Sequence, residues 1–335
     1  MEKVKELLTA FEGKTVFISG ATGLIGKTLV SRILEYNQDA AEPVRIAALV
    51  RNPEKANRLF PDADPDILCI YHGDVTLCEP CDIGADYIIH AASETSSRAF
   101  VENPVGTIRT ALRGTETMLE FARRNPCSGF VYLSSMEVYG TPSTDEKIDE
   151  THSTDLDPMK VRSCYPVSKR MCESLCASYA SEYGIPARVI RLTQTFGPGV
   201  EYHDGRVFAE FARCALEGRD IVLHTKGETR RSYLYTEDAV SAILTVLLKG
   251  RNAEAYNAAN EDTYCSVREM AELVSGMCAG GKTGVRIEEV PDAGVFGYAP
   301  VLRMNLDTKK LQALGWKPTT GLQQMFKNMM MEMKR

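Results

Sequence analysis

The chain has 335 residues, of which 44% are hydrophobic, and 39 Lys and Arg residues against 45 Asp and Glu residues give a net charge of −6. This composition is typical of globular proteins with a packed core. No basic block is present, so nucleic acid is not expected as a partner. No stretch approaches the roughly 20 apolar residues that cross a bilayer, so no membrane association is expected.

Short β-rich runs alternate with longer helical patterns over the first two thirds of the chain. This alternation predicts an α/β fold of the Rossmann type, a doubly wound parallel sheet covered by helices on both faces. The predicted strands are Thr15–Ser19, Arg45–Val50, Ile67–Tyr71, Tyr87–His90, Gly129–Ser134 and Ala187–Leu192. The predicted helices include Leu24–Tyr36, Thr107–Arg124 and Ser163–Tyr183.

Beyond about Phe196 the alternation ends, and shorter elements lie between Gly- and Pro-rich turns such as GPGVEYHDG. This change predicts a Rossmann domain over residues 1–195 and a smaller C-terminal α/β lobe over residues 196–335, with some interleaving of the two. The segment from Tyr139 to Val161, rich in Asp, Thr, Ser and Pro, is expected to be a surface loop above an active site.

The cysteines do not form a regular framework. Ten of them are scattered over predicted core elements, which suits a reducing compartment. Cys78 and Cys81 form a CxxC pair, but zinc needs four ligands and no second pair has a matching spacing, so no metal site is expected. The N-terminal segment is charged and lacks the apolar region of a signal peptide. We therefore expect a cytoplasmic location.

A glycine motif follows the first predicted strand directly. In GATGLIG, Gly20 suits a tight turn, Gly23 allows the backbone to approach a pyrophosphate, and Gly26 allows close helix packing. The unpaired N–H groups of the following helix start complete an anion site. The alternative is a glycine-rich turn without a ligand. The other residues of this motif that we expect to contact a dinucleotide are Thr22, Leu24 and Ile25.

The end of the second strand reads ALVRNPEK and has no carboxylate for the ribose hydroxyls of NAD. Arg51, helped by Lys55, is suited instead to the 2′-phosphate of NADP, so NADP(H) is favoured over NAD(H). The alternative for Arg51 is a solvated loop cation. Further cofactor contacts are expected after the third and fourth strands, at Asp74, Val75, His90, Ala91 and Ala92.

Tyr165 and Lys169 lie four residues apart in YPVSK, on one face of a predicted helix. A neighbouring ammonium and a cationic nicotinamide are expected to lower the pKa of the phenol, which makes Tyr165 a general base. Lys169 is suited to bind the nicotinamide ribose. Ser135, at the end of the fifth strand, is suited to hydrogen-bond the reacting oxygen.

The motifs GATGLIG, HAAS, LSSMEVYG and YPVSK occur in an order that resembles the extended short-chain dehydrogenase/reductases, the nucleotide-sugar epimerase/dehydratase family. The resemblance covers the chain from Thr15 to about Gly321. It implies an NAD(P)-dependent enzyme with a nucleotide-sugar substrate, in which Ser135, Tyr165 and Lys169 form the catalytic triad. We also expect a homodimer.

The resemblance implies substrate contacts as well. Arg231 in GETRRSYLYTEDAV matches an arginine near the substrate diphosphate, and Arg303 matches an arginine of the C-terminal signature that also reaches it. Two arginines suit a pyrophosphate, although each is also suited to a surface ion pair. Further substrate contacts are expected at Glu94, Thr95 and Gln194, where Gln194 replaces the usual Asn.

Two further positions depart from the family pattern and limit the reaction. Ala111 replaces a common Asn, which puts any proton relay there in doubt. Met136 stands where sugar 4,6-dehydratases have Asp and related decarboxylases have Ser, whereas Glu137 is kept as a catalytic residue. A thioether cannot protonate a departing hydroxyl, so one acid of the dehydratase mechanism is missing.

The sequence therefore favours oxidation of a sugar carbon, C4, to a ketone that is reduced again, which is epimerisation. The first alternative is an NADPH-dependent reductase of a nucleotide-linked keto sugar or ketose. The next is a UDP-glucuronate decarboxylase or sugar 4,6-dehydratase. A dinucleotide-sensing regulator without catalysis is the alternative from another class of protein, and the intact triad argues against it.

Overall fold

The computed structural model describes residues 2–77, 83–277, 283–290 and 301–334. The predicted CxxC pair, Cys78 and Cys81, lies outside the described residues. Among those that are described, no group of three or more His, Cys, Asp or Glu side chains is suited to hold a metal ion. No helix in the same residues is long and apolar enough to cross a membrane.

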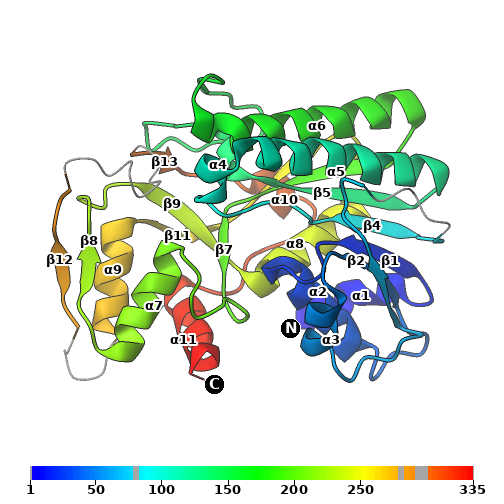
Figure 1. Cartoon of the computed structure of the whole chain (residues 1–335), viewed down its shortest axis with the longest axis horizontal. Helices are drawn as coiled ribbons and strands as arrows, with labels where there is room; N and C mark the ends of the chain where they lie inside the picture. Colours follow the sequence, from blue (N-terminus) through cyan, green and yellow to red (C-terminus); the bar gives the residue numbers. More distant parts are fainter. Residues whose placement is uncertain (1, 78–82, 278–282, 291–300, 335) are drawn as a thin grey trace.

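A seven-stranded parallel sheet forms the centre of the molecule (Figure 1), with the strand order β3-β2-β1-β4-β5-β6-β10. The strands are near-continuous apolar runs, as expected where both faces of a sheet are covered. In chain order they are β1 (Thr15–Ser19), β2 (Arg45–Val50), β3 (Leu68–His72), β4 (Tyr87–His90), β5 (Gly129–Ser135), β6 (Ala187–Leu192) and β10 (Ala255–Ala258). The α/β Rossmann prediction is confirmed, with β3 displaced by one residue and β5 extended by one.

Helices cover both faces of the sheet (Figure 1). One face is covered by α1 (Glu2–Leu8), the 3₁₀ turn η1 (Thr9–Phe11), α2 (Leu24–Tyr36) and α8 (Thr236–Lys249). The other face is covered by α5 (Pro104–Arg124) and α6 (Cys164–Tyr183), with the short helix α4 (Ala99–Glu102) beside α5. The short helix α3 (Pro53–Leu59) packs its Ala56 into the core of the first face. Helix α5 begins three residues earlier than predicted, because Asn103 caps it and Pro104 is suited to the first helical position.

The smaller lobe has its own apolar core. A four-stranded sheet contains β7 (Gln194–Phe196), β9 (Arg230–Tyr235), β11 (Asn260–Ser266) and β13 (Arg303–Met304), and a two-stranded sheet contains β8 (Ile221–Leu223) and β12 (Val285–Ile287). Three helices complete the lobe: α7 (Val207–Glu217), α9 (Val267–Gly276) and α11 (Leu322–Met333). The Phe196 ring stacks on Phe208 at 4.5 Å, which joins the sheet to α7.

The chain returns to the large sheet after entering the lobe. Strand β10 pairs with β6, and α8 packs against β5 and β6, so residues beyond 195 complete the Rossmann sheet. Trp316, which follows α10 (Lys309–Gln312), is fully buried and donates to the Ser241 hydroxyl at 2.9 Å. The expected interleaving is therefore extensive, and a single boundary at residue 195 describes the division only approximately.

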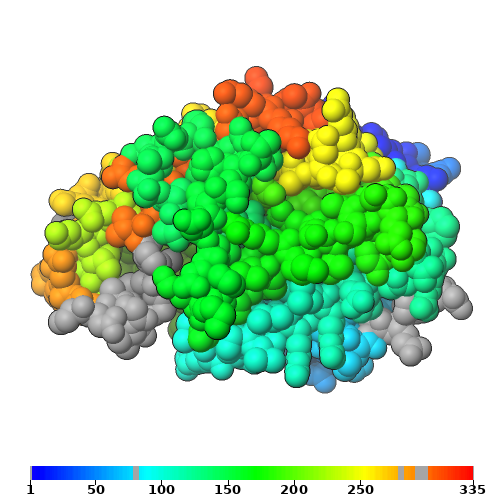
Figure 2. Space-filling view, turned by 90° about the horizontal axis from the view of Figure 1, so that it is seen from above, coloured from blue at the N-terminus to red at the C-terminus, as the bar shows by residue number. Residues whose placement is uncertain are grey.

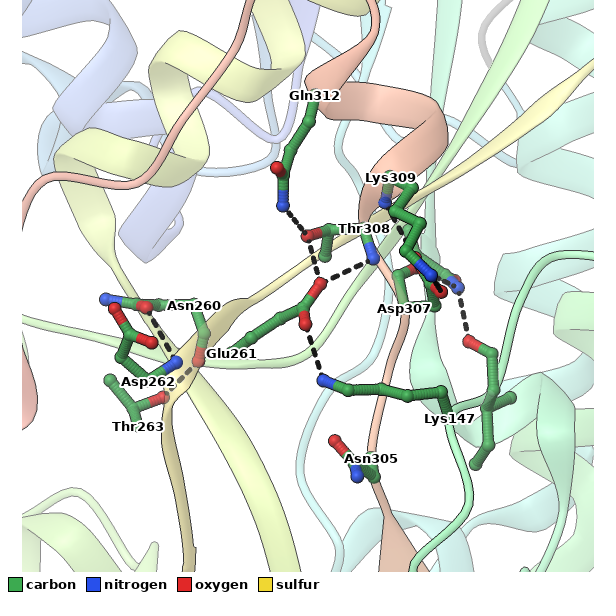
Figure 3. A network of polar contacts seen from close by, with 12 residues as sticks. Lys147, Asn260, Glu261, Asp262, Thr263, Asn305, Asp307, Thr308, Lys309 and Gln312 are labelled. Atoms are coloured by element: carbon green, nitrogen blue, oxygen red, sulfur yellow. Dashed lines mark hydrogen bonds and ion pairs between the residues drawn. The ribbon is translucent and has the colours of Figure 1, made fainter.

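The segment that follows β5 is tied to the lobe instead of lying free on the surface. It begins with the 3₁₀ turn η2 (Met136–Tyr139), and its Ile148 bridges to Leu306 and is buried. Figure 2 shows these green residues directly beside the orange C-terminal residues. In Figure 3, Glu261 accepts hydrogen bonds from Lys147 and from the Thr308 N–H and hydroxyl groups.

Candidate active site

The active-site region lies at the carboxyl ends of β1, β4 and β5. Neighbouring strands β1 and β4 connect to helices on opposite faces of the sheet, through α2 and α5 respectively. Ligands of doubly wound sheets bind in the crevice at such a switch point. The end of β5 carries Ser135 to the same edge.

The glycine loop has no room for side chains at two positions. Gly20 has a φ of +76°, and a Cβ there would lie 2.7 Å from the backbone nitrogen of Ala92. A Cβ on Gly26 would lie 2.2 Å from the carbonyl oxygen of Gly20. Helix α2 begins after Gly23 without a side-chain cap, so backbone N–H groups remain for an anion. This backbone cradle fits the pyrophosphate of a dinucleotide.

The remaining loop residues contribute backbone more than side chains. Leu24 packs against the lobe core, and Ile25 packs against the core of the sheet, while Thr22 lies half-buried between them and β1. Ala91 and Ala92 bring the end of β4 against Gly20. Small residues at this contact would let a dinucleotide approach the backbone closely, which stays a prediction.

Arg51 lies exposed at the end of β2, near Asp74. Burial alone would raise the pKa of the Asp74 carboxyl, but hydrogen bonds from Thr76 and the charge of Arg51 hold it below its ordinary value. Val75 is buried beside them. Lys55 does not join Arg51 as expected, because its ammonium lies 3.3 Å from Glu201, across in the lobe.

His90 supports this surface from beneath and does not line it. Its Nδ1 lies 2.7 Å from the Ser19 hydroxyl and its Nε2 lies 3.2 Å from the Thr115 hydroxyl. Full burial, together with the nearby charge of Lys169, lowers the pKa of His90 to about 3. The imidazole is therefore neutral, and it links β1, β4 and α5 inside the protein.

The predicted triad is assembled. A hydrogen bond joins the side chains of Ser135 and Tyr165. Lys169 donates to the Leu133 carbonyl at 2.8 Å, and its ammonium lies 4.7 Å from the centre of the Tyr132 ring and 5.7 Å from that of Tyr165. Both Tyr165 and Lys169 are buried, so their positions are set by packing.

Burial shifts the pKa values of both catalytic groups. It lowers the pKa of Lys169 to about 8. The pKa of Tyr165 is raised, first by burial and then by the charge of Glu137, and the hydrogen bond with Ser135 only partly opposes this. The protein's own groups therefore raise the pKa, because desolvation of the phenolate outweighs the hydrogen bond. The expected lowering also involves the positive charge of a bound nicotinamide, so it stays a prediction.

Glu137 lies next to Tyr165, but a cation holds its carboxylate. Nη1 of Arg162 lies 2.9 Å from one Glu137 oxygen and Nη2 lies 3.1 Å from the other. The Glu137 N–H also donates to the Ser135 hydroxyl at 3.2 Å. Arg162 is not among the site residues expected from the sequence, although its position three residues before Tyr165 is the available signal.

Met136 and Ala111 have roles in packing. Met136 is buried, and its sulfur accepts a hydrogen bond from the Thr193 hydroxyl at 3.2 Å. Ala111 is buried in α5, and its carbonyl accepts from the thiol of Cys172. Neither side chain carries an exchangeable proton, so neither supplies the acid or relay that the family pattern places there.

On the substrate side, Gln194 and Arg231 are brought to neighbouring strands. Gln194 on β7 is in register with Tyr233 on β9, and Arg231 is two residues from Tyr233, so both side chains leave the same face of the sheet. The Gln194 Oε1 and the Arg231 Nε are buried without a hydrogen-bond partner in the described part of the protein. Glu94 lies near Tyr165 and accepts from the N–H groups of Thr95 and Ser96.

Arg303 does not join Arg231. Its register partner on β9 is Arg230, whose side chain leaves the opposite face from that of Arg231. Arg303 and Arg230 both contact Asp145, and Tyr264 donates to the same carboxylate at 2.6 Å. The surface ion pair considered for Arg303 is thus present, and shared binding of one diphosphate by the two predicted arginines is not supported by this geometry.

A buried ion pair behind the triad was also missed. Arg191 on β6 contacts Glu173 at 2.7 Å, and Glu173 accepts from Ser134 at 2.5 Å. Glu173 is one helical turn beyond Lys169 on α6. The pair therefore fastens the helix that carries Lys169 to the ends of β5 and β6, and its residues are too far apart in the chain for local patterns to reveal it.

Comparison with known proteins agrees with this geometry. Residues 16–259 match the model of the NAD dependent epimerase/dehydratase family. UDP-glucuronic acid decarboxylase 5 of Arabidopsis thaliana is 32% identical over 92% of this chain and 86% of its own length. UDP-glucuronic acid decarboxylase 1 of Xenopus tropicalis is 28% identical over 95% of this chain and 72% of its own length.

A solved structure shows the same fold at lower identity. The UDP-glucose 4-epimerase of Thermotoga maritima superimposes with a TM-score of 0.79 at 22% identity, covering 96% of this chain and 98% of that one. The glycine loop, the triad and the match over most of the chain lead to one conclusion. This protein is an enzyme and belongs to the NAD-dependent epimerase/dehydratase family.

Proposed function

We propose that this enzyme oxidises C4 of a nucleotide-linked hexuronic acid, releases the C5 carboxyl group as CO2 and reduces the resulting ketone to a nucleotide-linked pentose. The geometric observation that carries the proposal is the assembled Ser135–Tyr165–Lys169 triad beside a Met136 that is turned into the core. The similarity to UDP-glucuronic acid decarboxylases over nine tenths of the chain supports UDP-glucuronic acid as the substrate. Decarboxylation thereby replaces epimerisation, which the sequence favours, as the leading proposal.

In this reaction Tyr165 takes the proton from the C4 hydroxyl while Ser135 hydrogen-bonds the same oxygen. When bound, the nicotinamide accepts the hydride from C4 and later returns it. The C4 ketone is β to the C6 carboxylate, so loss of CO2 breaks the C5–C6 bond and places negative charge on the C4 oxygen. Ser135 and Tyr165 stabilise this charge. C5 then takes up a proton from water, and Tyr165 returns its proton to the C4 oxygen when the ketone is reduced.

The residue at position 136 suits decarboxylation better than loss of water. Water loss needs an acid at the departing hydroxyl, and Met136 provides none. CO2 departs without a general acid. The Lys169 ammonium, whose pKa burial lowers to about 8, stays largely charged near neutral pH and favours the phenolate of Tyr165.

Epimerisation at C4 is the second candidate, and one observation favours it. Arg162 occupies both oxygens of Glu137, the carboxylate nearest to Tyr165 on η2. A carboxylate with both oxygens paired to a guanidinium is not free to contact C5. Epimerisation needs no proton at C5, so it uses the triad alone.

The two candidates are separated by their products. The enzyme is incubated with UDP-glucuronic acid, UDP-glucose or UDP-galactose, each with NAD+ or NADP+, and the products are identified by mass spectrometry and NMR. We expect UDP-glucuronic acid to lose one CO2 and give a pentose. An unchanged mass with a new C4 configuration would establish epimerisation instead, and a gain of two hydrogens with NADPH would establish the reductase.

For the cofactor we propose that NADP(H) binds more tightly than NAD(H). Arg51 is exposed at the end of β2, and the described residues place no ion-pair partner within 4 Å of it. A guanidinium in this position is available for a 2′-phosphate. The nearby Asp74 carboxylate, held ionised, is instead a candidate partner for a cofactor hydroxyl or amine.

We also propose that the enzyme is a homodimer, joined through the outer faces of α5 and α6. These helices pack against each other and lie side by side in Figures 1 and 2. Large apolar side chains with helical spacing remain exposed on this side, namely Val101, Val105, Ile108, Val167 and Met171. Two-fold dimers are the commonest homo-oligomers, and a two-fold axis lets one such surface bind its own copy.

Light scattering after gel filtration tests the dimer. We expect the wild type to have twice the mass of the chain and the Val105→Asp/Met171→Asp variant to have the mass of one chain. Met331→Asp, which adds one charge on the exposed face of α11, is the control and leaves the dimer intact. A wild-type enzyme with the mass of one chain at micromolar concentration overturns the proposal.

A further inference from the structure

Five residues, Tyr165 among them, form a closed ring of contacts. The Tyr165 ring stacks on Phe100, with centroids 4.2 Å apart and planes inclined by 14°. The Arg162 guanidinium carbon lies 4.7 Å from the centre of the same Phe100 ring. Arg162 binds Glu137, and Ser135 hydrogen-bonds both the Glu137 N–H and Tyr165. Each member of the ring therefore restrains its two neighbours.

We propose that Arg162 is the positioning residue of this ring, and that it fixes the carboxylate of Glu137 beside Tyr165 and offsets its charge. The inference rests on the proposed function only in that Tyr165 acts as the base of the hydride step. Arg162 is the residue added to the site, and it acts on the reaction through Tyr165 and Glu137. Decarboxylation and epimerisation share this step, so the role of Arg162 is the same in both.

The geometry of the pair requires an arginine. Two separate nitrogens of the guanidinium contact the two oxygens of Glu137, an arrangement that a single ammonium cannot reproduce. Arg162 belongs to the 3₁₀ turn η3 (Val161–Ser163), which leads directly into α6. The turn and the helix thus place the guanidinium at a fixed distance from Tyr165.

A simple surface ion pair does not account for Arg162. Its side chain is 27% exposed, and that of Glu137 is 30% exposed. The Arg162 Nε is buried and has no hydrogen-bond partner within the described residues. One N–H of the guanidinium is thus buried without a hydrogen bond, which costs free energy. A role of the guanidinium in positioning Glu137 accounts for that cost.

The charges around Tyr165 come from several elements, and they determine the sign of the effect. Glu137 on η2 and Glu94 after β4 raise the pKa of Tyr165, whereas Arg162 on η3 lowers it. The other groups that face the phenol are the Lys169 ammonium on α6, the Ser135 hydroxyl on β5 and the Tyr132 phenol on β5. Removing Arg162 alone leaves the charge of Glu137 unopposed and raises the pKa of Tyr165 further.

The test is the pH profile of kcat/KM for wild type, Arg162→Gln, Glu137→Gln and the double variant. UDP-glucuronic acid is the substrate, and UDP-glucose replaces it if only the latter is converted. A base that must lose its proton gives a rate that rises with pH through its pKa. We expect Arg162→Gln to move this rise by about one pH unit upward, and Glu137→Gln to move it downward.

The double variant and a conservative variant complete the experiment. With both charges removed, the rise in the double variant should return close to its wild-type position. Arg162→Lys should keep the pH profile, because it keeps the charge, but it should lower kcat by about tenfold because the two-point contact with Glu137 is lost.

Two results overturn the proposal. One is a fall in kcat and melting temperature in Arg162→Gln with an unmoved pH profile, since this is the signature of a purely structural residue. The other is a double variant whose rise stays at the position of one of the single variants instead of returning toward that of the wild type. If CO2 is not released but the profile moves as described, only the proposed decarboxylation fails. If CO2 is released and the profile does not move, only the role of Arg162 fails.

Discussion

The proposed cofactor side and the proposed substrate side of Tyr165 differ in whether the polar side chains named for each have hydrogen-bond partners. On the cofactor side, His90 contacts both Ser19 and Thr115, and the Lys169 ammonium contacts a backbone carbonyl. On the substrate side, Arg231 and Gln194 each bury a polar atom that has no partner in the described protein.

This difference indicates two ways of recognising a ligand. The cofactor side presents backbone, glycine and alanine surfaces, and the hydrogen-bonded His90 and Lys169 lie behind them. The substrate side presents side chains that still need a hydrogen bond. An unpartnered buried polar atom costs about 1–3 kcal/mol, and a ligand that supplies the missing bond recovers that energy. The predictions below test this division.

The largest expected effect is that of Tyr165→Phe, which removes the base and keeps the ring stacked on Phe100. We expect kcat to fall by about 10²–10⁴-fold while dinucleotide affinity changes by only a few-fold, because the cofactor surface does not depend on the hydroxyl. Steady-state kinetics and calorimetric titration of the cofactor measure the two quantities. Tyr179→Phe, on the same helix, is the control and should keep kcat. Near-wild-type turnover in Tyr165→Phe would remove the triad.

The next prediction concerns the buried His90 behind the cofactor surface. Its pKa of about 3 in the folded protein lies below the ordinary value of 6.5, so below pH 6.5 the unfolded chain binds a proton that the folded protein does not. The contribution of His90 to stability is complete above pH 6.5 and falls by about 1.4 kcal/mol for each pH unit below it. Between pH 7 and pH 5 we expect the loss from this residue to be about 2 kcal/mol.

Urea unfolding at these two pH values tests the prediction. His90→Gln should be less stable than wild type at pH 7, because it loses the contacts of the imidazole with the Ser19 and Thr115 hydroxyls. It should also lose about 2 kcal/mol less than wild type on going to pH 5. His152→Gln, in the exposed part of the segment after β5, is the control. Equal losses in wild type and His90→Gln would contradict a neutral buried imidazole.

The cofactor side was also the part that the sequence predicted well. Its strands are continuous apolar runs with local turn signals, so β1, β2, β4 and β6 have the predicted bounds. Gly20 and Gly26 were identified because only glycine fits where the backbone passes this closely. The Tyr165–Lys169 pair is local as well, since a helix brings residues four apart to one face.

The rest of the site depends on contacts between distant segments. Arg162 and Phe100 are 62 residues apart and meet only after α4 is placed against η3. Strands β7 and β13 are two or three residues long, so periodicity cannot establish their pairing with β9 or show that Arg303 faces Arg230. Burial of the phenol, which raises the pKa of Tyr165 in the protein alone, is not visible in YPVSK.

A smaller effect is expected from Arg231→Met, which removes an unpartnered group from the substrate side. Because the Arg231 Nε makes no hydrogen bond within the described protein, the free energy of unfolding should change by less than about 1 kcal/mol. The KM for the nucleotide sugar should rise by about tenfold or more, since a charge-assisted contact to the substrate is lost. Arg230→Met is the matched control, because its side chain leaves the other face of β9. Similar increases in KM for both variants would contradict the assignment of the Arg231 face to the substrate.

The smallest expected effect is on cofactor choice. In the wild type, Arg51 should give NADP+ a Kd about tenfold below that of NAD+, since an exposed guanidinium gains a charge-assisted contact of about 1.5 kcal/mol with the 2′-phosphate. Arg51→Asp removes this partner and adds an acceptor for the 2′-hydroxyl, so the order should reverse. Lys55→Gln should leave the order unchanged, because Lys55 is engaged with Glu201 across in the lobe. Calorimetric titration of both cofactors into the three proteins measures the six dissociation constants. Equal Kd values in the wild type that Arg51→Asp does not alter would show that Arg51 is a solvated loop cation. In that case the cofactor side would recognise its ligand through backbone and small residues alone.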